Sequence, residues 1–231
     1  MNLRCDQISP RELYRMLLIA VAPRPIAWVS TISRSGQPNL APFSFFNAVS
    51  ADPPLLGFSP GIRQLEHGVE PKGTVVNIRE TGEFVVNVVT FEIAEAMNIT
   101  SGDYAQGVNE FDLAQLAMRP SQAVHPPQVA ASPVSFECKL DRILDFGDPV
   151  TSSLVIGQIV ALHVEEKVLR EGRLELNALD LIGRLSGMQY TRTTARFEMQ
   201  RPVVKKVTCS AGRLVKTRRH SMELGQQFLE G

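Results

Sequence analysis

The segment between residues 24 and 50, RPIAWVSTISRSGQPNLAPFSFFNAVS, constrains the fold most, because it is typical of two β-strands that face each other. Residues 26–33 are strand-like, Ser35-Gly36 supplies a turn, and residues 39–50 form the returning strand. Several positions that should face inward carry a hydroxyl, an amide or a proline: Ser30, Thr31, Pro42, Ser44 and Asn47. Packing alone does not require this polarity, so the hairpin is a candidate wall of a binding site.

The rest of the chain predicts many short strands and few short helices. One helix begins at Ser9-Pro10, with Glu12 at the capping-box position, and continues through Leu18. A second helix over 72–80 ends at Thr81-Gly82. The other segments are a helix candidate at 92–99 and strands at 55–59, 84–90, 134–144, 154–166 and 179–186. This pattern favours a mainly β protein, an antiparallel barrel with short peripheral helices, over a parallel βαβ sheet.

The composition is that of an ordinary soluble globular protein. Of the 231 residues 44% are hydrophobic and 21% are charged, and 24 basic residues balance 24 acidic ones. A net charge of zero gives no long-range attraction for nucleic acid or an anionic membrane, and we expect neither as a partner. The longest apolar run, Met16 to Ala22, is too short to span a membrane, and the N-terminus does not resemble a signal peptide. We therefore expect a cytoplasmic protein.

The last thirty residues differ from the rest in charge. Residues 202–231 contain six Lys and Arg residues against two Glu residues, a net charge of +4 (6 − 2). We therefore divide the chain into a domain at 1–201 and a basic C-terminal extension at 202–231. The extension is expected to be an arm on a partner subunit or simply an unstructured tail.

Several catalytic motifs are excluded by their chemistry or are absent. The run Gly57-Phe58-Ser59-Pro60-Gly61 fits the pattern of a hydrolase nucleophile elbow, but Pro60 has no N–H to contribute to an oxyanion hole. No dinucleotide-binding glycine motif, phosphate-binding loop or zinc-protease motif occurs, and the four histidines lie far apart. The three cysteines are widely spaced and predict neither a disulfide framework nor a metal site.

A phosphate site is the remaining candidate, because hydroxyls and cations occur beside a predicted helix start at Lys72-Gly73-Thr74. A phosphate monoester requires several hydrogen-bond donors and at least one positive charge, and the free N–H groups of a helix start add to its binding. The candidate donors are Ser30, Thr31, Ser59, Thr74, Arg63 and Lys72. The alternative is that they are strand-edge serines, a capping threonine and surface cations, and on spacing alone this alternative is favoured.

Longer motifs resemble a known family. The run APRPIAWVSTISRSGQPNLAPFSFFNAVSADPP (residues 22–54) closely resembles the flavin reductase-like family of FMN-binding split-barrel proteins, in its flavoredoxin-type branch. Further similar runs are KGTVVNI at 72–78, TGEFVVN at 81–87 and RLSGMQY at 184–190, and together the runs span about residues 9–200. The sequence departs from the family pattern at Gly73, where Asp is common, and at Ser186, where a second Gly is common.

The resemblance implies a fold, a cofactor and its contacts. The fold would be a homodimeric antiparallel split β-barrel with one FMN per subunit near the dimer interface. By position in the motifs, Ser30 and Thr31 would line the flavin, while Lys72 and Thr74, with Ser59 and Arg63, would hold its phosphate. The residues expected at the flavin ring are Ser44, Phe45, Phe46 and Asn47. Pro42 fits this arrangement because it leaves a ladder position unpaired where a ligand could lie.

The resemblance also implies an activity. We expect an NAD(P)H-dependent oxidoreductase that transfers hydride from NADH or NADPH to FMN and supplies reduced flavin to a flavin-dependent monooxygenase or another electron-transfer partner. No side chain is required as acid or base, and none is assigned as catalytic. The alternative is an FMN-binding electron carrier without NAD(P)H turnover. A third reading, oxidation of a pyridoxal-type phosphate, is opposed by the flavoredoxin-like hairpin.

Overall fold

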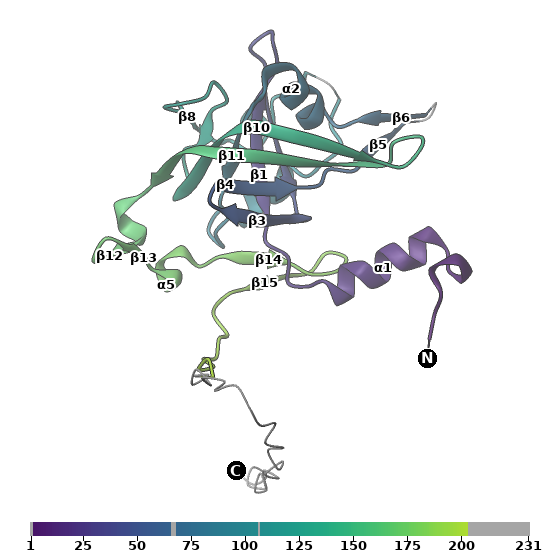
Figure 1. Ribbon diagram of the computed structural model, residues 1–231. Coiled ribbons are helices and arrows are strands. Elements are labelled where there is room, and N and C mark those ends of the chain that lie inside the picture. The colour runs from purple at the N-terminus through teal and green to yellow at the C-terminus, as the bar shows by residue number, and fades with distance from the viewer. Residues whose placement is uncertain (1, 66–67, 106, 203–231) are drawn as a thin grey trace, which may run out of the picture. The chain divides into compact units, whose positions relative to one another are not determined.

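The structure, a computed structural model, describes residues 2–65, 68–105 and 107–202 (Figure 1). Contacts between residues divide the chain into one unit from Met1 to Arg196 and another from Phe197 to Gly231. All helices and strands of the described residues belong to the first unit. The basic extension predicted at 202–231 lies outside the described residues except for Pro202.

Seven strands form one antiparallel sheet in the order β2-β1-β7-β10-β11-β4-β3. Their bounds are β1 Ala27–Ile32, β2 Pro38–Phe43, β3 Phe46–Ala51, β4 Pro54–Phe58, β7 Glu83–Asn87, β10 Val134–Phe146 and β11 Ser152–Val164. The two edge strands, β2 and β3, follow each other in sequence with only Ser44 and Phe45 between them. The two edges of the sheet therefore meet at this corner, where the Ser59 N–H donates to the Phe45 carbonyl (2.7 Å).

The predicted single strand over 39–50 is wrong at this corner. β2 pairs with β1, whereas β3 pairs with β4, so the chain bends at Ser44 and Phe45 as it passes from one edge of the sheet to the other. The prediction of a mainly β protein with a large antiparallel sheet and few helices is confirmed. Among the described residues β2 and β3 are not paired with each other, so the ladder does not close into a continuous ring.

Both faces of β1 are buried, and each face belongs to a different hydrophobic cluster. Val29 packs with Phe43, Phe58 and Phe84, whose rings follow one another at centroid distances of 5.2 and 5.5 Å. Trp28 belongs to the second cluster on the opposite face. The strand alternates sides, so consecutive residues enter separate cores and leave no face for solvent.

Helices and short strands surround the sheet. The helices are η1 Cys5–Gln7, α1 Pro10–Ala20, α2 Gly73–Thr81, α3 Ala94–Ile99, α4 Glu110–Leu113, η2 Glu166–Val168 and α5 Leu176–Leu179. The short strands are β5 Ile62–Leu65, β6 Gly68–Pro71, β8 Met118–Arg119, β9 Gln128–Val129, β12 Leu169–Arg170, β13 Arg173–Leu174, β14 Ile182–Arg184 and β15 Tyr190–Arg192. In Figure 1, α1 and the β14–β15 pair lie in a layer beneath the main sheet.

The helix signals in the sequence are confirmed, but one hairpin is missed. Ser9 and Glu12 form the expected capping box of α1, and Gly82 ends α2 in the left-handed conformation (φ 71°). The β5–β6 hairpin was not predicted, because its prolines and glycines resemble a loop; Arg63 and Glu70 are paired across it and form an ion pair of 3.0 Å. In the described part of the chain, no helix has the length and apolar character needed to cross a membrane.

Candidate functional site

Some of the binding residues expected from the sequence lie beside hollows at the two ends of the edge strand β2, whereas Ser30, Thr31, Ser59, Lys72 and Thr74 line neither hollow. Its first residues, Pro38 and Asn39, border a polar hollow at the start of α2, and its end at Pro42 and Phe43 borders a second hollow beside α1. From Asn39 to Pro42 the chain advances three residues, about 10 Å along a strand. The outer side of an edge strand has unpaired peptide groups. Between the two hollows the outer side of β2 therefore offers backbone carbonyls only, because Pro38 and Pro42 have no N–H and the Leu40 N–H donates to the Glu110 carboxylate (3.0 Å).

The hollow at the start of α2, here called the α2 pocket, has a volume of about 550 Å³. Its charged and amide-bearing lining residues are Gln37, Asn39, Arg63, Glu70, Asn77 and Glu110. Gly73, the first residue of α2, also lines it. The helix begins after Lys72 with no side-chain cap and with no acidic residue in its first turn. Such a helix start favours an anion, because its N–H groups and dipole are positive.

Two cations lie at this helix start, and both are held by acidic groups. Arg63 pairs with Glu70 and also donates to the Tyr104 carbonyl. The Lys72 ammonium lies 3.1 Å from the Asp103 carboxylate, and the Asp103 side chain is 70% exposed. An ion pair this open to water stabilises the fold by only about 0–1 kcal/mol. A phosphate could therefore take the place of Asp103 at small cost.

The hydroxyls predicted at the phosphate already have protein partners. The Thr74 hydroxyl accepts from the Asn39 amide (3.0 Å), and the Ser59 hydroxyl donates to the Ser153 carbonyl (2.8 Å). Gly73 lies close to the Asn39 side chain, because a Cβ at this position would lie 3.2 Å from the Asn39 side-chain oxygen. An aspartate at position 73, common in the family pattern, would thus crowd the amide that holds Thr74.

Ser30 and Thr31 are completely buried, and their hydroxyls serve the interior. The Ser30 hydroxyl donates to the Pro127 carbonyl (2.5 Å) and lies 3.3 Å from the Asn87 amide nitrogen. The Thr31 hydroxyl accepts from the Asn77 amide (3.0 Å). These bonds account for the polarity of β1 without a ligand, because a buried hydroxyl is costly unless it is hydrogen-bonded.

The residues expected at the flavin ring lie at the corner between β2 and β3. Ser44, Phe45, Phe46 and Asn47 line a hollow of about 270 Å³, here called the corner pocket, whose other wall is the end of α1. Phe45 is 42% exposed, and its ring centroid lies 6.4 Å from that of Tyr14 on α1. An exposed aromatic side chain beside a small hollow is suited to contact with a flat ring.

Glu110 is a buried acid in the α2 pocket. It is 8% exposed, and its carboxylate accepts a hydrogen bond from the Leu40 N–H (3.0 Å). Burial raises the pKa of the Glu110 carboxyl. No group of three His, Cys, Asp or Glu residues that could hold a metal ion occurs in the part of the chain that the structure describes.

Arg24 borders this region and was not predicted. Only 4% of it is exposed, and it lines both the corner pocket and the adjoining hollow beside α1. Its guanidinium donates to the carbonyls of Leu18, Val21 and Leu185 at 2.5–2.6 Å. Since Leu185 is 161 residues away, no local pattern marks this arginine.

A family model matches most of this chain, and relatives and solved structures are similar to it. The model of the flavin reductase like domain matches residues 20–182. A protein of Halalkalibacterium halodurans is 38% identical over 208 residues, which cover 88% of this chain and 98% of the relative. The structure is similar to nitrilotriacetate monooxygenase component B from Bacillus cereus (TM-score 0.81, 32% identity, 86% and 98% of the two chains). It is also similar to 2-nitrobenzoate 2-nitroreductase from Pseudomonas fluorescens (TM-score 0.76, 33% identity, 92% and 100%).

Proposed function

This chain belongs to the flavin reductase-like family, and on that premise we propose that it is an FMN-binding, NAD(P)H-dependent flavin reductase. The two similar solved proteins described above also have names of oxidoreductases or their components, which supports this proposal. The observation that carries the proposal is the juxtaposition of an uncapped helix start, with Lys72 and Arg63 beside it, and the free edge of β2.

FMN would lie along β2, with its phosphate at the α2 pocket and its ring toward the corner pocket. The Gly73 end of α2, Lys72 and Arg63 supply the positive charge for the phosphate. The residues at the ring would be Ser44, Phe45, Phe46 and Asn47. Pro42 supports this placement, because it lies on an edge strand and has no N–H to pair. The fold would then be the split barrel of the family.

The chemistry follows from what the protein must do around the cofactor. Bound FMN supplies the hydride acceptor, so the chain needs no side-chain nucleophile. Its own residues would bind the phosphate, orient the ring against the corner and present backbone carbonyls from β2. Ser30 and Thr31 would act indirectly, since their hydroxyls hold β1 in place behind the strand that faces the ring.

A protein partner is expected for the reduced flavin. The similar Bacillus cereus protein is named as a component of a monooxygenase, which supports delivery of reduced flavin to an oxygenase. The name of the similar Pseudomonas fluorescens protein supports a second candidate function, direct reduction of an organic substrate. An electron carrier without NAD(P)H turnover is a third. We also propose that two copies form a homodimer.

One experiment separates these functions. Purified protein is titrated with FMN, FAD and riboflavin, and the holoprotein is then assayed for oxidation of NADH and NADPH. We expect FMN uptake and turnover with at least one nucleotide. FMN uptake without turnover supports the electron carrier instead, and turnover that requires a nitroaromatic acceptor supports direct reduction. A preparation that stays colourless after FMN is added contradicts all three.

A further inference from the structure

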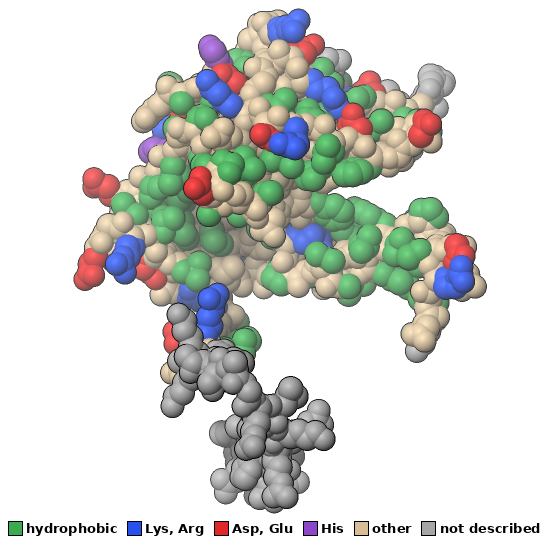
Figure 2. Space-filling view, viewed as in Figure 1, with side chains coloured by type: hydrophobic (Ala, Val, Ile, Leu, Met, Phe, Trp, Pro, Cys, Tyr) green, Lys and Arg blue, Asp and Glu red, His purple; other side chains and the backbone are tan. Residues whose placement is uncertain are grey.

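The hollow beside α1, which Pro42 and Phe43 border, differs from the other two hollows in its charge. This arginine pocket has a volume of about 360 Å³ and is lined by Arg24 and Arg184 together with Tyr14, Tyr190, Asn98 and Ser101. No acidic residue of the described chain lines it. Figure 2 shows hydrophobic side chains along α1 and on the facing side of the sheet, with a basic patch between them. The hollow is therefore positively charged and partly apolar.

Arg24 is a buried cation without an acidic partner. Six other arginines of the described residues lie within 4 Å of a carboxylate, whereas Arg24 and Arg184 do not. The Leu18 and Val21 carbonyls at the end of α1 hold the Arg24 guanidinium, but they are neutral groups. Burial lowers the pKa of Arg24, and the neighbouring Arg184 charge lowers it further. An anion in the hollow would relieve both effects.

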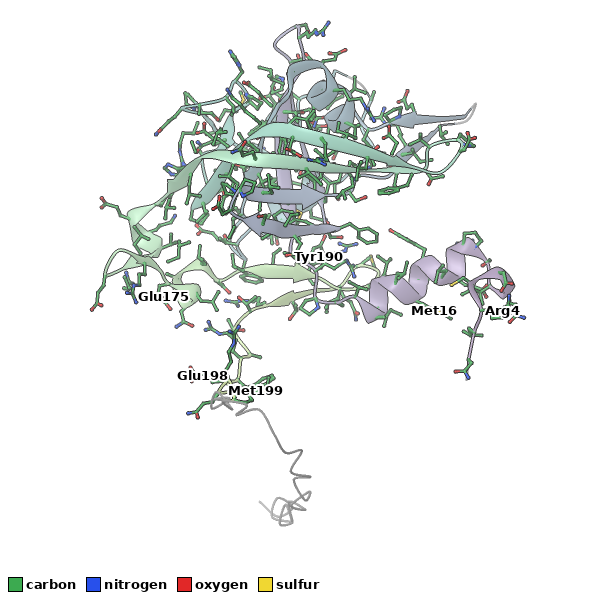
Figure 3. All side chains as sticks on the ribbon, viewed as in Figure 1. Arg4, Met16, Glu175, Tyr190, Glu198 and Met199 are labelled. Atoms are coloured by element: carbon green, nitrogen blue, oxygen red, sulfur yellow. The ribbon has the colours of Figure 1, made fainter. Side chains whose placement is uncertain are left out.

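Arg184 is the more accessible of the two cations. Its guanidinium lies 4.4 Å above the Tyr190 ring and donates to the Gly187 carbonyl. The turn that follows is fixed by a hydrogen bond from the Leu185 N–H to the Gln189 carbonyl (3.0 Å). Figure 3 shows Tyr190 at the layer of β14 and β15, below the sheet. Arg184 is thus positioned by the fold while most of its N–H groups remain available.

The lining also limits the size and shape of a ligand. The volume lies near the lower end of the range of ligand pockets, about 300–1,000 Å³, which favours a compound with a single ring over a dinucleotide. Tyr14 and Tyr190 offer aromatic surfaces, and Asn98 and Ser101 offer polar groups. A guanidinium group binds a carboxylate through two parallel hydrogen bonds.

We infer that the arginine pocket binds a small aromatic carboxylate, with Arg184 as the principal contact and Arg24 as the buried charge behind it. Pro42 and Ser44 also line this pocket, so the ligand would lie beside the end of β2 where we place the flavin ring. That such a ligand is a second substrate, reduced by the bound flavin, rests on the proposed function. The binding of the carboxylate does not rest on it.

Benzoate and benzamide test the charge requirement, because they have nearly the same size and shape and only benzoate is ionised at neutral pH. Isothermal titration calorimetry of the full chain, with and without FMN, should show benzamide binding at least tenfold more weakly than benzoate. Arg184→Met should weaken benzoate about tenfold without changing benzamide, and Arg184→Lys should retain part of the affinity. Arg192→Met is the matched control, since Arg192 also stacks on a ring (Phe91, 4.1 Å) but pairs with Asp180.

Equal affinities for the two probes, no benzoate binding, or an unchanged Arg184→Met variant would overturn the inference, and the wild-type comparison needs no variant to fold. FMN uptake measured in parallel keeps the two hypotheses separate. Selective benzoate binding without FMN uptake contradicts the flavin reductase and leaves the anion pocket. FMN uptake without selectivity for benzoate contradicts the pocket alone.

Discussion

At the scale of single residues, a substitution of Lys72 tests whether the start of α2 binds a phosphate or is only a charged surface. Lys72→Ala should weaken FMN binding about tenfold, or about 1.4 kcal/mol, while riboflavin, which has no phosphate, should bind as before. The Lys72 ammonium lies at the start of α2 and gives up only an exposed ion pair with Asp103 when it binds the phosphate. Its removal therefore costs FMN a charged contact that riboflavin never makes. Fluorescence titration with both flavins measures the difference.

Lys167→Ala provides the control for this prediction. Lys167 also forms an exposed ion pair, with Glu165 at 2.8 Å, but it lies on η2 and not at the start of α2. Both flavins should bind this variant normally. If Lys72→Ala weakens FMN and riboflavin equally, Lys72 does not contact the phosphate.

Gly157 is a residue whose smallness the core requires. A Cβ at this position in β11 would lie 2.2 Å from Phe84, which is completely buried. Gly157→Ala should therefore destabilise the protein by about 1–3 kcal/mol, because the core must shift to accept the methyl group. Urea unfolding measures this loss. Gly61→Ala, with no atom within 4 Å of its Cβ, should change the free energy of unfolding by less than about 0.5 kcal/mol.

At the scale of elements, α1 depends on its ends rather than on burial. None of its residues is buried, and its first turn is held by the Ser9–Glu12 capping box. The hydrogen bonds from Ser9 lower the pKa of Glu12 below its ordinary value of 4.5. A lowered folded-state pKa means that the carboxylate stabilises the helix above pH 4.5. This contribution is lost as the pH falls through the lowered value.

The hydrogen-exchange protection factors of the α1 amides should therefore fall below about pH 4.5, and Ser9→Ala should lower them already at neutral pH. The amides of α2, whose start has no side-chain cap, serve as the internal control. Equal protection of α1 in Ser9→Ala and wild type would show that the capping box contributes nothing to the helix.

The sequence predicts the helix ends correctly where a few neighbouring residues determine them. The capping box of α1 and the glycine stop of α2 are short patterns, and both helices begin or end where those patterns predict. The bend at Ser44-Phe45 and the β5–β6 hairpin depend on which strands lie nearby, and no local pattern encodes that. The strand that the sequence places over 39–50 therefore forms two strands.

The same distinction holds for the candidate site. The helix start at Lys72 and the β2 edge with Pro42 follow from residue type and order, and the sequence indicates them. The bond from the Ser30 hydroxyl to the Pro127 carbonyl joins residues 97 apart, so a single sequence cannot distinguish this structural serine from a ligand-binding one. Arg24 and Arg184 are 160 residues apart in sequence, and only the folded chain brings both to the lining of one hollow.

At the scale of the whole molecule, α1 exposes apolar side chains around most of its circumference. Tyr14, Met16, Leu17 and Ile19 on α1 and Val21 at its C-terminal end are 43–67% exposed, and Phe45 and Val49 near the corner are 42% and 53% exposed. A short helix with no buried residue is marginal in water, and an apolar surface of this extent is typical of an interface. A second copy of the chain is the partner that the proposed homodimer provides.

Analytical ultracentrifugation should therefore find a particle of about 51 kDa, twice the 25.5 kDa of one chain. Ile19→Glu places a charge at the most exposed apolar position of α1, and it should shift the population to monomer because an unpaired charge is costly to bury in an interface. Leu113→Glu changes an apolar side chain of 45% exposure on another helix, α4, and should leave the dimer intact. A wild-type monomer at micromolar concentration would contradict the homodimer. A dimer unaffected by Ile19→Glu would instead place its interface on another surface, and α1 would then need a different partner.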